Sequence, residues 1–190
     1  LNLALAVGAY EGRGYGESIG AFVANDGLKI PFSGDLDTAI AAGAAPDADE
    51  ETLARAAAAA DLKAIARHIP ARPGFLQVPH PFKEYGLQAA AYLSGTSLTA
   101  HPMFGHDIIY THPLNRGAPI GRTADSDFLN FVDAVSTIEQ GVYLSVGSAV
   151  MSPMIFEKAL SMSRNAARQR GRAIEHFAIH VVDLAAATWD

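Results

Sequence analysis

Three histidines and an aspartate gather in one short stretch of the sequence. His101, His106, Asp107 and His112 fall within twelve residues, directly after a predicted strand at Ser97 to Ala100. Imidazole and carboxylate groups this close together can transfer protons or ligate a metal ion. Since no recognised metal spacing such as H-E-x-x-H occurs, we interpret the four residues as candidate catalytic groups and assign no metal ligand.

Two of these residues also have a purely structural interpretation. His112 precedes Pro113 and can simply end a turn. Asp107 can be a turn residue that bonds its own backbone, as aspartates in loops often do. The sequence leaves both interpretations open.

A second group of small and polar residues follows two other predicted strands. Gly147 and Ser148 come after the strand Val142 to Val146, and Asp183 comes after the strand Phe177 to Val182. Backbone amides at such a turn, ahead of a helix, favour a phosphate or a carboxylate. The alternative is that Gly147 and Ser148 merely allow a tight turn.

A third group is the glycine-dense segment Glu11 to Gly20. Its glycines at 12, 14, 16 and 20 do not match G-x-G-x-x-G, and a helical segment precedes them where a dinucleotide loop would follow a strand. We therefore predict a tight connection between two helices. Glu11, Arg13, Tyr15 and Glu17 remain able to line a pocket.

The first half of the chain is expected to be mainly helical. Helices are predicted at Leu1 to Tyr10 and Glu51 to His68, which are rich in alanine or leucine. A further helix is predicted at Ser18 to Asn25, where Ile19, Phe22 and Val23 share one face. Residues 34–50 mix Asp, Gly, Ala and Pro without periodicity, and we expect a mobile acidic loop there.

In the second half, predicted helices alternate with predicted strands. The helices are Phe82 to Ser94, which Lys83 and Glu84 open on its solvent face, Asp125 to Glu139, and one that begins at Pro153. Strand–helix–strand units in sequence imply parallel pairing. We therefore expect a single α/β domain over residues 1–190, a Rossmann-like three-layer domain with a mostly parallel sheet, whose ligands bind where the strands end.

Bulk composition narrows the class of function. The 190 residues carry a formal net charge of −6, which argues against nucleic-acid binding but suits a cationic small molecule. The chain has no cysteine, no apolar run long enough for a membrane span and no signal peptide, so we expect a soluble cytoplasmic protein. Because Leu1 and Asp190 both lie close to predicted elements, we also expect a fragment of a longer chain.

Two stretches are similar to a known family. Gly105 to His112 and Val142 to Val150 resemble the deoxyhypusine synthase-like proteins, and an uncharacterised bacterial branch in particular. The likeness covers roughly the last 110 residues. It implies a homo-oligomer, a dimer or a tetramer, that binds NAD and transfers part of a small polyamine-like substrate.

The resemblance also assigns roles. Asp107 would hold the cationic substrate, His101 or His106 would transfer protons, and His112 would match a histidine that ends the same turn. Cofactor binding would fall to Gly105, Gly147, Ser148 and Asp183. The lysine that forms a covalent imine in the family would lie beyond Asp190.

The chain also departs from the family pattern. His101-Pro102-Met103 replaces a Thr-Asp-Gly segment, and Met151-Ser152-Pro153 replaces a Lys-His-His run. The first departure removes an acid that contacts NAD in the family. Together they favour a relative with an altered substrate, which binds NAD or a related nucleotide, over a true synthase. Two alternatives stay open: a His/Asp-dependent hydrolase, metal-assisted or not, and a non-catalytic ligand-binding oligomer.

Overall fold

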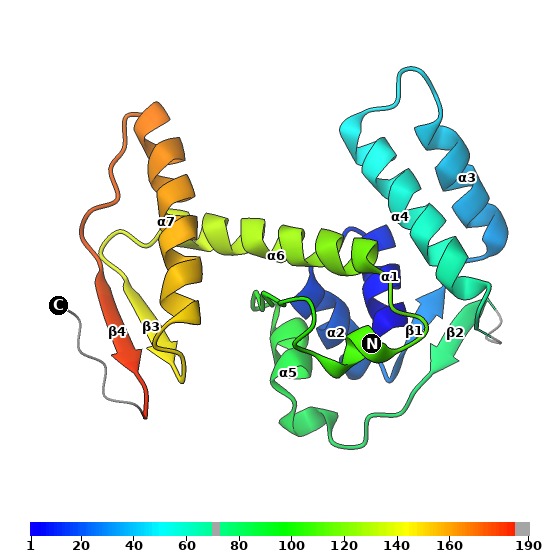
Figure 1. The fold of residues 1–190 in the computed structure, drawn as a ribbon, viewed down its shortest axis with the longest axis horizontal. Coiled ribbons are helices and arrows are strands. Elements are labelled where there is room, and N and C mark those ends of the chain that lie inside the picture. Colours follow the sequence, from blue (N-terminus) through cyan, green and yellow to red (C-terminus); the bar gives the residue numbers. More distant parts are fainter. Residues whose placement is uncertain (70–72, 185–190) are drawn as a thin grey trace. The chain divides into compact units, whose positions relative to one another are not determined.

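The chain folds into two compact units. A computed structural model describes residues 1–69 and 73–184, and packing divides the chain into unit 1, Leu1–Asp127, and unit 2, Phe128–Asp190 (Figure 1). The two units are described separately below.

Unit 1 is built mainly from helices around an aliphatic core. Its helices and strands are α1 (Asn2–Tyr10), α2 (Tyr15–Ala24), β1 (Gly27–Ile30), α3 (Ser33–Gly43), α4 (Glu50–Ala66), β2 (Gly74–Gln77), the short 3-10 helices η1 (Lys83–Tyr85) and η2 (Ile108–Thr111), and α5 (Leu87–Ser94). Strands β1 and β2 pair antiparallel, with Gly27 opposite Gln77. Leu3, Leu36, Leu62 and Ile65 are buried in the core that joins α1, α3 and α4.

The segment expected to be a mobile acidic loop begins with a helix. Residues 33–43 form α3, which packs against α4. Leu36 is buried in the core, and the Asp35 carboxylate accepts a hydrogen bond from the amide of Phe32 at the start of the helix. The apolar residue and the helix-starting carboxylate together outweigh the glycines at either end.

The three-layer, mostly parallel sheet that we predicted is wrong. Helices account for 56% of the chain, and the described residues form two sheets of two strands each. The predicted strand Ser97 to Ala100 is absent because its backbone pairs with no other strand. The amide of Ala100 instead donates to the Asp127 carboxylate, with 2.7 Å between N and Oδ2.

Unit 2 contains the parallel strands. Helix α6 (Gly117–Ser136) runs through the boundary between the units, followed by β3 (Val142–Val146), α7 (Met151–Gln169) and β4 (Ala178–Val182). Strands β3 and β4 pair in parallel, as the sequence predicted, and the register runs from Val142 opposite Ala178 to Val146 opposite Val182. Phe156 on α7 stacks on Tyr143 of β3, with 4.1 Å between ring centroids, and closes the core on one face.

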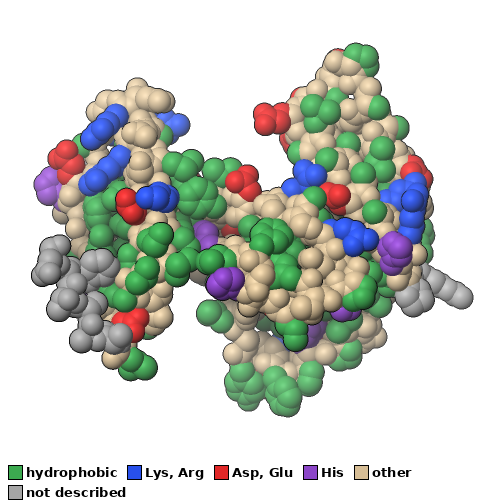
Figure 2. All heavy atoms as spheres, in the orientation of Figure 1, with side chains coloured by type: hydrophobic (Ala, Val, Ile, Leu, Met, Phe, Trp, Pro, Cys, Tyr) green, Lys and Arg blue, Asp and Glu red, His purple; other side chains and the backbone are tan. Residues whose placement is uncertain are grey.

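The other face of β3 is apolar and exposed. Val142, Leu144 and Val146, which alternate along β3, are 60%, 58% and 69% exposed. Hydrophobic side chains are visible on the surface of both units in Figure 2. No helix in the described part of the chain is long and apolar enough to cross a membrane.

Candidate functional site

A buried carboxylate organises the most polar part of unit 1. Helix α2 begins after Gly14, which has no side chain to cap the helix. The side chain of Asp127, on α6, takes that role: its Oδ2 accepts the amide of Gly16 at 2.8 Å, and the amide of Tyr15 also bonds this carboxylate. Asp127 thereby occupies the positive N-terminal end of α2, where an anion is favoured.

Asp127 joins three segments that lie far apart in the sequence. Besides the start of α2, it holds the amide of Ala100, and it interacts electrostatically with His101. The side chain is 1% exposed. Burial raises the pKa of Asp127, and the backbone hydrogen bonds and His101 partly oppose that rise because they favour the ionised form.

The glycine-dense segment allows these close approaches. A Cβ on Gly14 would overlap the Oδ1 atom of Asp127, and a Cβ on Gly16 would overlap the carbonyl oxygen of Leu98. The segment connects α1 to α2, as predicted. Gly14 and Gly16 are therefore required by packing against Asp127 and Leu98.

His101 lies beside this carboxylate and is half-buried. Its Nε2 atom lies 3.2 Å from the Thr99 hydroxyl. Burial lowers the pKa of His101, and the negative charge of Asp127 opposes this. An imidazole with a lowered pKa is neutral at pH 7 and is able to accept a proton.

Asp107 combines a structural contact with an electrostatic one. Its Oδ1 accepts the amide of Ile109 at 3.2 Å and caps η2, so the turn role considered above is present. The negative charge of Asp107 also acts on the phenols of Tyr15 and Tyr110. Burial raises the pKa of each phenol, and the charge of Asp107 raises it further. The Tyr110 hydroxyl is buried and has no hydrogen-bond partner among the described residues.

The remaining residues of the histidine loop do not join this cluster. His106 is exposed, and its amide donates to the carbonyl of Met103 in a turn that Gly105 completes with φ +91°. The Nδ1 atom of His112 accepts the amide of Leu114 at 3.1 Å. His112 lines a different pocket, together with His68 and Arg116.

Three of the predicted cofactor residues, Gly147, Ser148 and Asp183, follow the C-terminal ends of β3 and β4 in unit 2. The amide of Gly147 donates to the carbonyl of Val182 at 2.8 Å, so Gly147 and Asp183 both lie where the parallel strands end. Gly147 has φ +75°, a conformation that favours glycine. Ser148 accepts the amide of Ser152 through its Oγ at 3.0 Å.

The C-terminal ends of these strands and the start of α7 offer few unbonded backbone amides to a phosphate group. A helix has four amides at its start that can bind an anion. In α7 the amide of Ser152 is already taken by Ser148, and Pro153 has none. The residues present therefore fit the diphosphate of a dinucleotide poorly.

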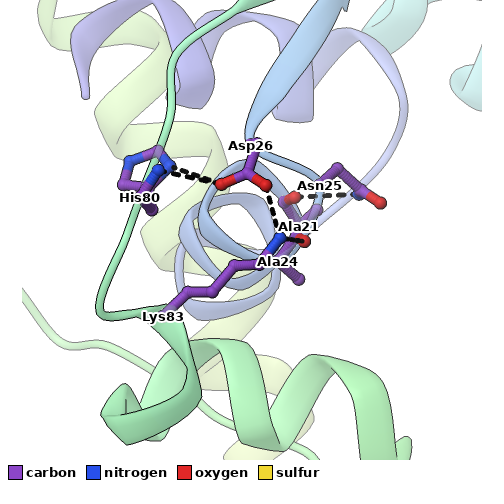
Figure 3. A network of polar contacts seen from close by, with 6 residues as sticks. All are labelled: Ala21, Ala24, Asn25, Asp26, His80 and Lys83. Atoms are coloured by element: carbon purple, nitrogen blue, oxygen red, sulfur yellow. Dashed lines mark hydrogen bonds and ion pairs between the residues drawn. The ribbon is translucent and has the colours of Figure 1, made fainter.

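A further polar network joins the α2–β1 turn to the segment before α5. Asp26, which has φ +52°, accepts hydrogen bonds from the amide of His80 at 2.8 Å and from Nζ of Lys83 at 2.5 Å (Figure 3). Lys83 also donates to the carbonyl of Ala24 at 2.9 Å. These contacts lower the pKa of Asp26, the Lys83 hydrogen bond most. Lys83 was expected on the solvent face of a helix, but it ties two segments together.

Neither the comparisons with known proteins nor the local geometry identifies a cofactor or a metal ion. No protein-family model, curated protein or solved structure matches the chain. Across residues 1–69 and 73–184, no group of three or more His, Asp or Glu side chains is arranged to hold a metal ion. The functional argument therefore rests on the residues described above.

Proposed function

We propose that this chain is an enzyme of the deoxyhypusine synthase-like group that acts on a small cationic, polyamine-like substrate. In this proposal the carboxylate of Asp107 pairs with the substrate's ammonium group, and His101 transfers a proton. Both residues belong to unit 1, and Tyr15 and Asp127 link them indirectly. The charge of Asp107 acts on the Tyr15 phenol, the Tyr15 amide bonds the carboxylate of Asp127, and Asp127 interacts electrostatically with His101.

The observation that carries the proposal is the arrangement around Asp107. One carboxylate oxygen is used by Ile109, and the side chain remains exposed. Asp107 is close enough to Tyr110 to raise the pKa of its phenol, and Phe104 stacks on Tyr110 with 5.2 Å between ring centroids. A carboxylate beside aromatic faces suits an alkylammonium ion, which gains both an ion pair and a cation–π contact.

His101 supplies the acid–base group. It is half-buried and neutral near pH 7, beside a carboxylate that is able to stabilise its protonated form. The metal-assisted alternative has less support, because the described residues bring no three ligands together.

The nicotinamide nucleotide implied by the family resemblance stays a prediction. If it binds, Gly147, Ser148 and Asp183 are its candidate contacts, although the amides left at the start of α7 are few. Ultraviolet absorbance of the small molecules released on denaturing the purified protein would detect a retained nucleotide. The homo-oligomer also stays a prediction, which light scattering at micromolar concentration would test.

Calorimetric titration with spermidine tests the cationic site. Asp107→Asn keeps the acceptor for the Ile109 amide and deletes the charge, so thermal stability should change little. Affinity for spermidine should fall by about 1.5–3 kcal/mol, the usual contribution of a charge-assisted hydrogen bond. Asp125→Asn, an exposed charge change on α6, is the matched control.

Two results would count against the proposal. Spermidine binding that is equally tight in Asp107→Asn would reduce Asp107 to a turn residue. An equal loss of affinity in Asp125→Asn would mean that only the net negative charge attracts spermidine.

A further inference from the structure

A surface pocket of unit 1 carries hydrogen-bond donors and no acidic group. Its lining consists of His68, Ile69, His112, Pro113, Leu114 and Arg116. Half of these residues have donor side chains and the other half are apolar. The described lining of the pocket therefore offers donors and apolar groups to a ligand, and no carboxylate.

The apolar walls hold the pocket in place. Ile69 and Leu114 both pack against the core cluster of unit 1. His68 follows the end of α4, and His112 directly follows η2. Side chains on a loop anchored in this way are better positioned than side chains on a free loop.

Hydrogen bonding orients His112 as a donor. Its Nδ1 accepts the amide of Leu114 at 3.1 Å, so this nitrogen carries no proton. The ring proton of the neutral imidazole is then on Nε2, the atom on the other side of the ring. The turn that the sequence predicted for His112 thus leaves it with one donor available to a ligand.

Arg116 is fixed by the backbone and has no acidic partner. Its Nη1 donates to the carbonyl of Asn115 at 2.8 Å and to that of Pro113 at 3.4 Å. No carboxylate of the described residues lies within ion-pair distance of Arg116, whereas Arg13 has two such partners and Arg122 has one. The rest of the guanidinium group is free to bind an oxyanion in the planar, bidentate way that arginine favours.

We infer that this pocket binds the phosphate group of a small molecule. Arg116 supplies the charge, His112 donates through Nε2, and His68 completes the set of donors. Arg116 also directly precedes the first residue of α6, so the positive end of a 20-residue helix dipole adjoins the same loop. The inference does not rest on the proposed function, which uses none of these residues.

Nuclear magnetic resonance titration of the full chain with inorganic phosphate, at constant ionic strength, tests the inference. We expect saturable shifts of the Arg116 Nε–H signal and of the His112 ring signals. Arg116→Ala should weaken phosphate binding about tenfold to a hundredfold, since it removes charge-assisted hydrogen bonds. Arg122→Ala, a change of equal charge at an arginine that is paired with Asp61, should leave binding unchanged.

Two variants of His112 separate binding from structure. His112→Asn keeps an acceptor near the position of Nδ1 for the Leu114 amide but has no donor near Nε2, so it should bind phosphate about two- to tenfold more weakly while the turn survives. His112→Gln keeps a donor near Nε2 and should bind more tightly than His112→Asn.

If Arg116→Ala does not fold, Arg116→Lys, which loses the planar fork, should also weaken binding.

Several outcomes would overturn the inference. One is phosphate shifts that do not saturate. Another is native affinity in both Arg116→Ala and His112→Asn. A third is an equal loss in Arg122→Ala, which would show that phosphate responds only to overall charge.

Discussion

The carboxylate of Asp127 accepts the backbone amide of Gly16 at 2.8 Å, although 111 residues separate them in the chain. Helix α2 therefore begins with a cap supplied by another helix. The same Oδ2 atom accepts the amide of Ala100, so this one side chain links the start of α2 to the end of segment 97–100.

Removing this carboxylate should destabilise unit 1. Asp127→Ala leaves the buried amide of Gly16 and the partly buried amide of Ala100 without an acceptor, and we expect a loss of about 3 kcal/mol in the free energy of unfolding. Asp127→Asn keeps one oxygen acceptor and should cost less. Chemical denaturation followed by circular dichroism measures both, with Asp125→Asn as the exposed control. Native stability in Asp127→Ala would contradict the capping role.

Methyl groups on the two glycines near Asp127 should also destabilise the chain. We expect Gly14→Ala and Gly16→Ala to cost about 2–4 kcal/mol each, since the new Cβ overlaps Asp127 or the backbone of Leu98. Gly121→Ala, in the interior of α6 with open space around its Cβ, should instead stabilise by about 0.5–1 kcal/mol. Thermal unfolding of the three variants checks the opposite signs, and a stable Gly16→Ala would show that the segment can move aside.

The lowered pKa of His101 predicts a pH dependence of stability. In the unfolded chain this imidazole gains its proton near its ordinary pKa of about 6.5, and in the folded chain only at lower pH. The unfolded state therefore binds more protons in that window. The contribution of His101 to the free energy of unfolding is complete above about pH 6.5, and it is lost as pH falls through the pKa of His101 in the folded chain. His101→Gln should make the unfolding temperature fall less between about pH 8 and pH 5. An unchanged slope would contradict the shift.

The Asp26 network predicts part of the acid unfolding. The pKa of Asp26 is lowered, mainly by the hydrogen bond from Lys83, so its contribution is present above the ordinary aspartate pKa of about 3.9. That contribution disappears as pH falls through the lower folded value. Asp26→Asn, which tolerates the positive φ, should reduce this loss. The same change in a Lys83→Met background should have a smaller effect, and equal effects in both backgrounds would show that the two side chains are not coupled.

The sequence predicted local elements better than their partners. The bounds of β3 were predicted as observed, because β-branched and aromatic residues alternate there between turn residues. Strands β1 and β2 were missed because each has only four residues, with Gly27 and Lys29 in the first. The segment 97–100 has residues that favour a strand, but a strand must pair with a neighbouring strand. The amide of Ala100 bonds the carboxylate of Asp127 instead.

The candidate site was predicted only in part for the same reason. His101 and Asp107 were identified from their residue types, whereas the role of Asp127 depends on a contact across the fold. A signal did exist: Ile120, Thr123 and Asp127 follow helical spacing, and all three are buried. An acidic residue on such a stripe indicates a partner elsewhere in the chain. Nothing local in the sequence connects His68 to His112.

The link between Gly16 and Asp127 also has a consequence for folding kinetics. A contact that spans 111 residues closes a long loop, and the chain must lose that entropy before the hydrogen bond forms. We therefore expect α2 to assemble on its neighbours without a cap and to receive one late, after the rate-limiting step. Substitutions at Asp127 should then accelerate unfolding and leave the refolding rate nearly unchanged.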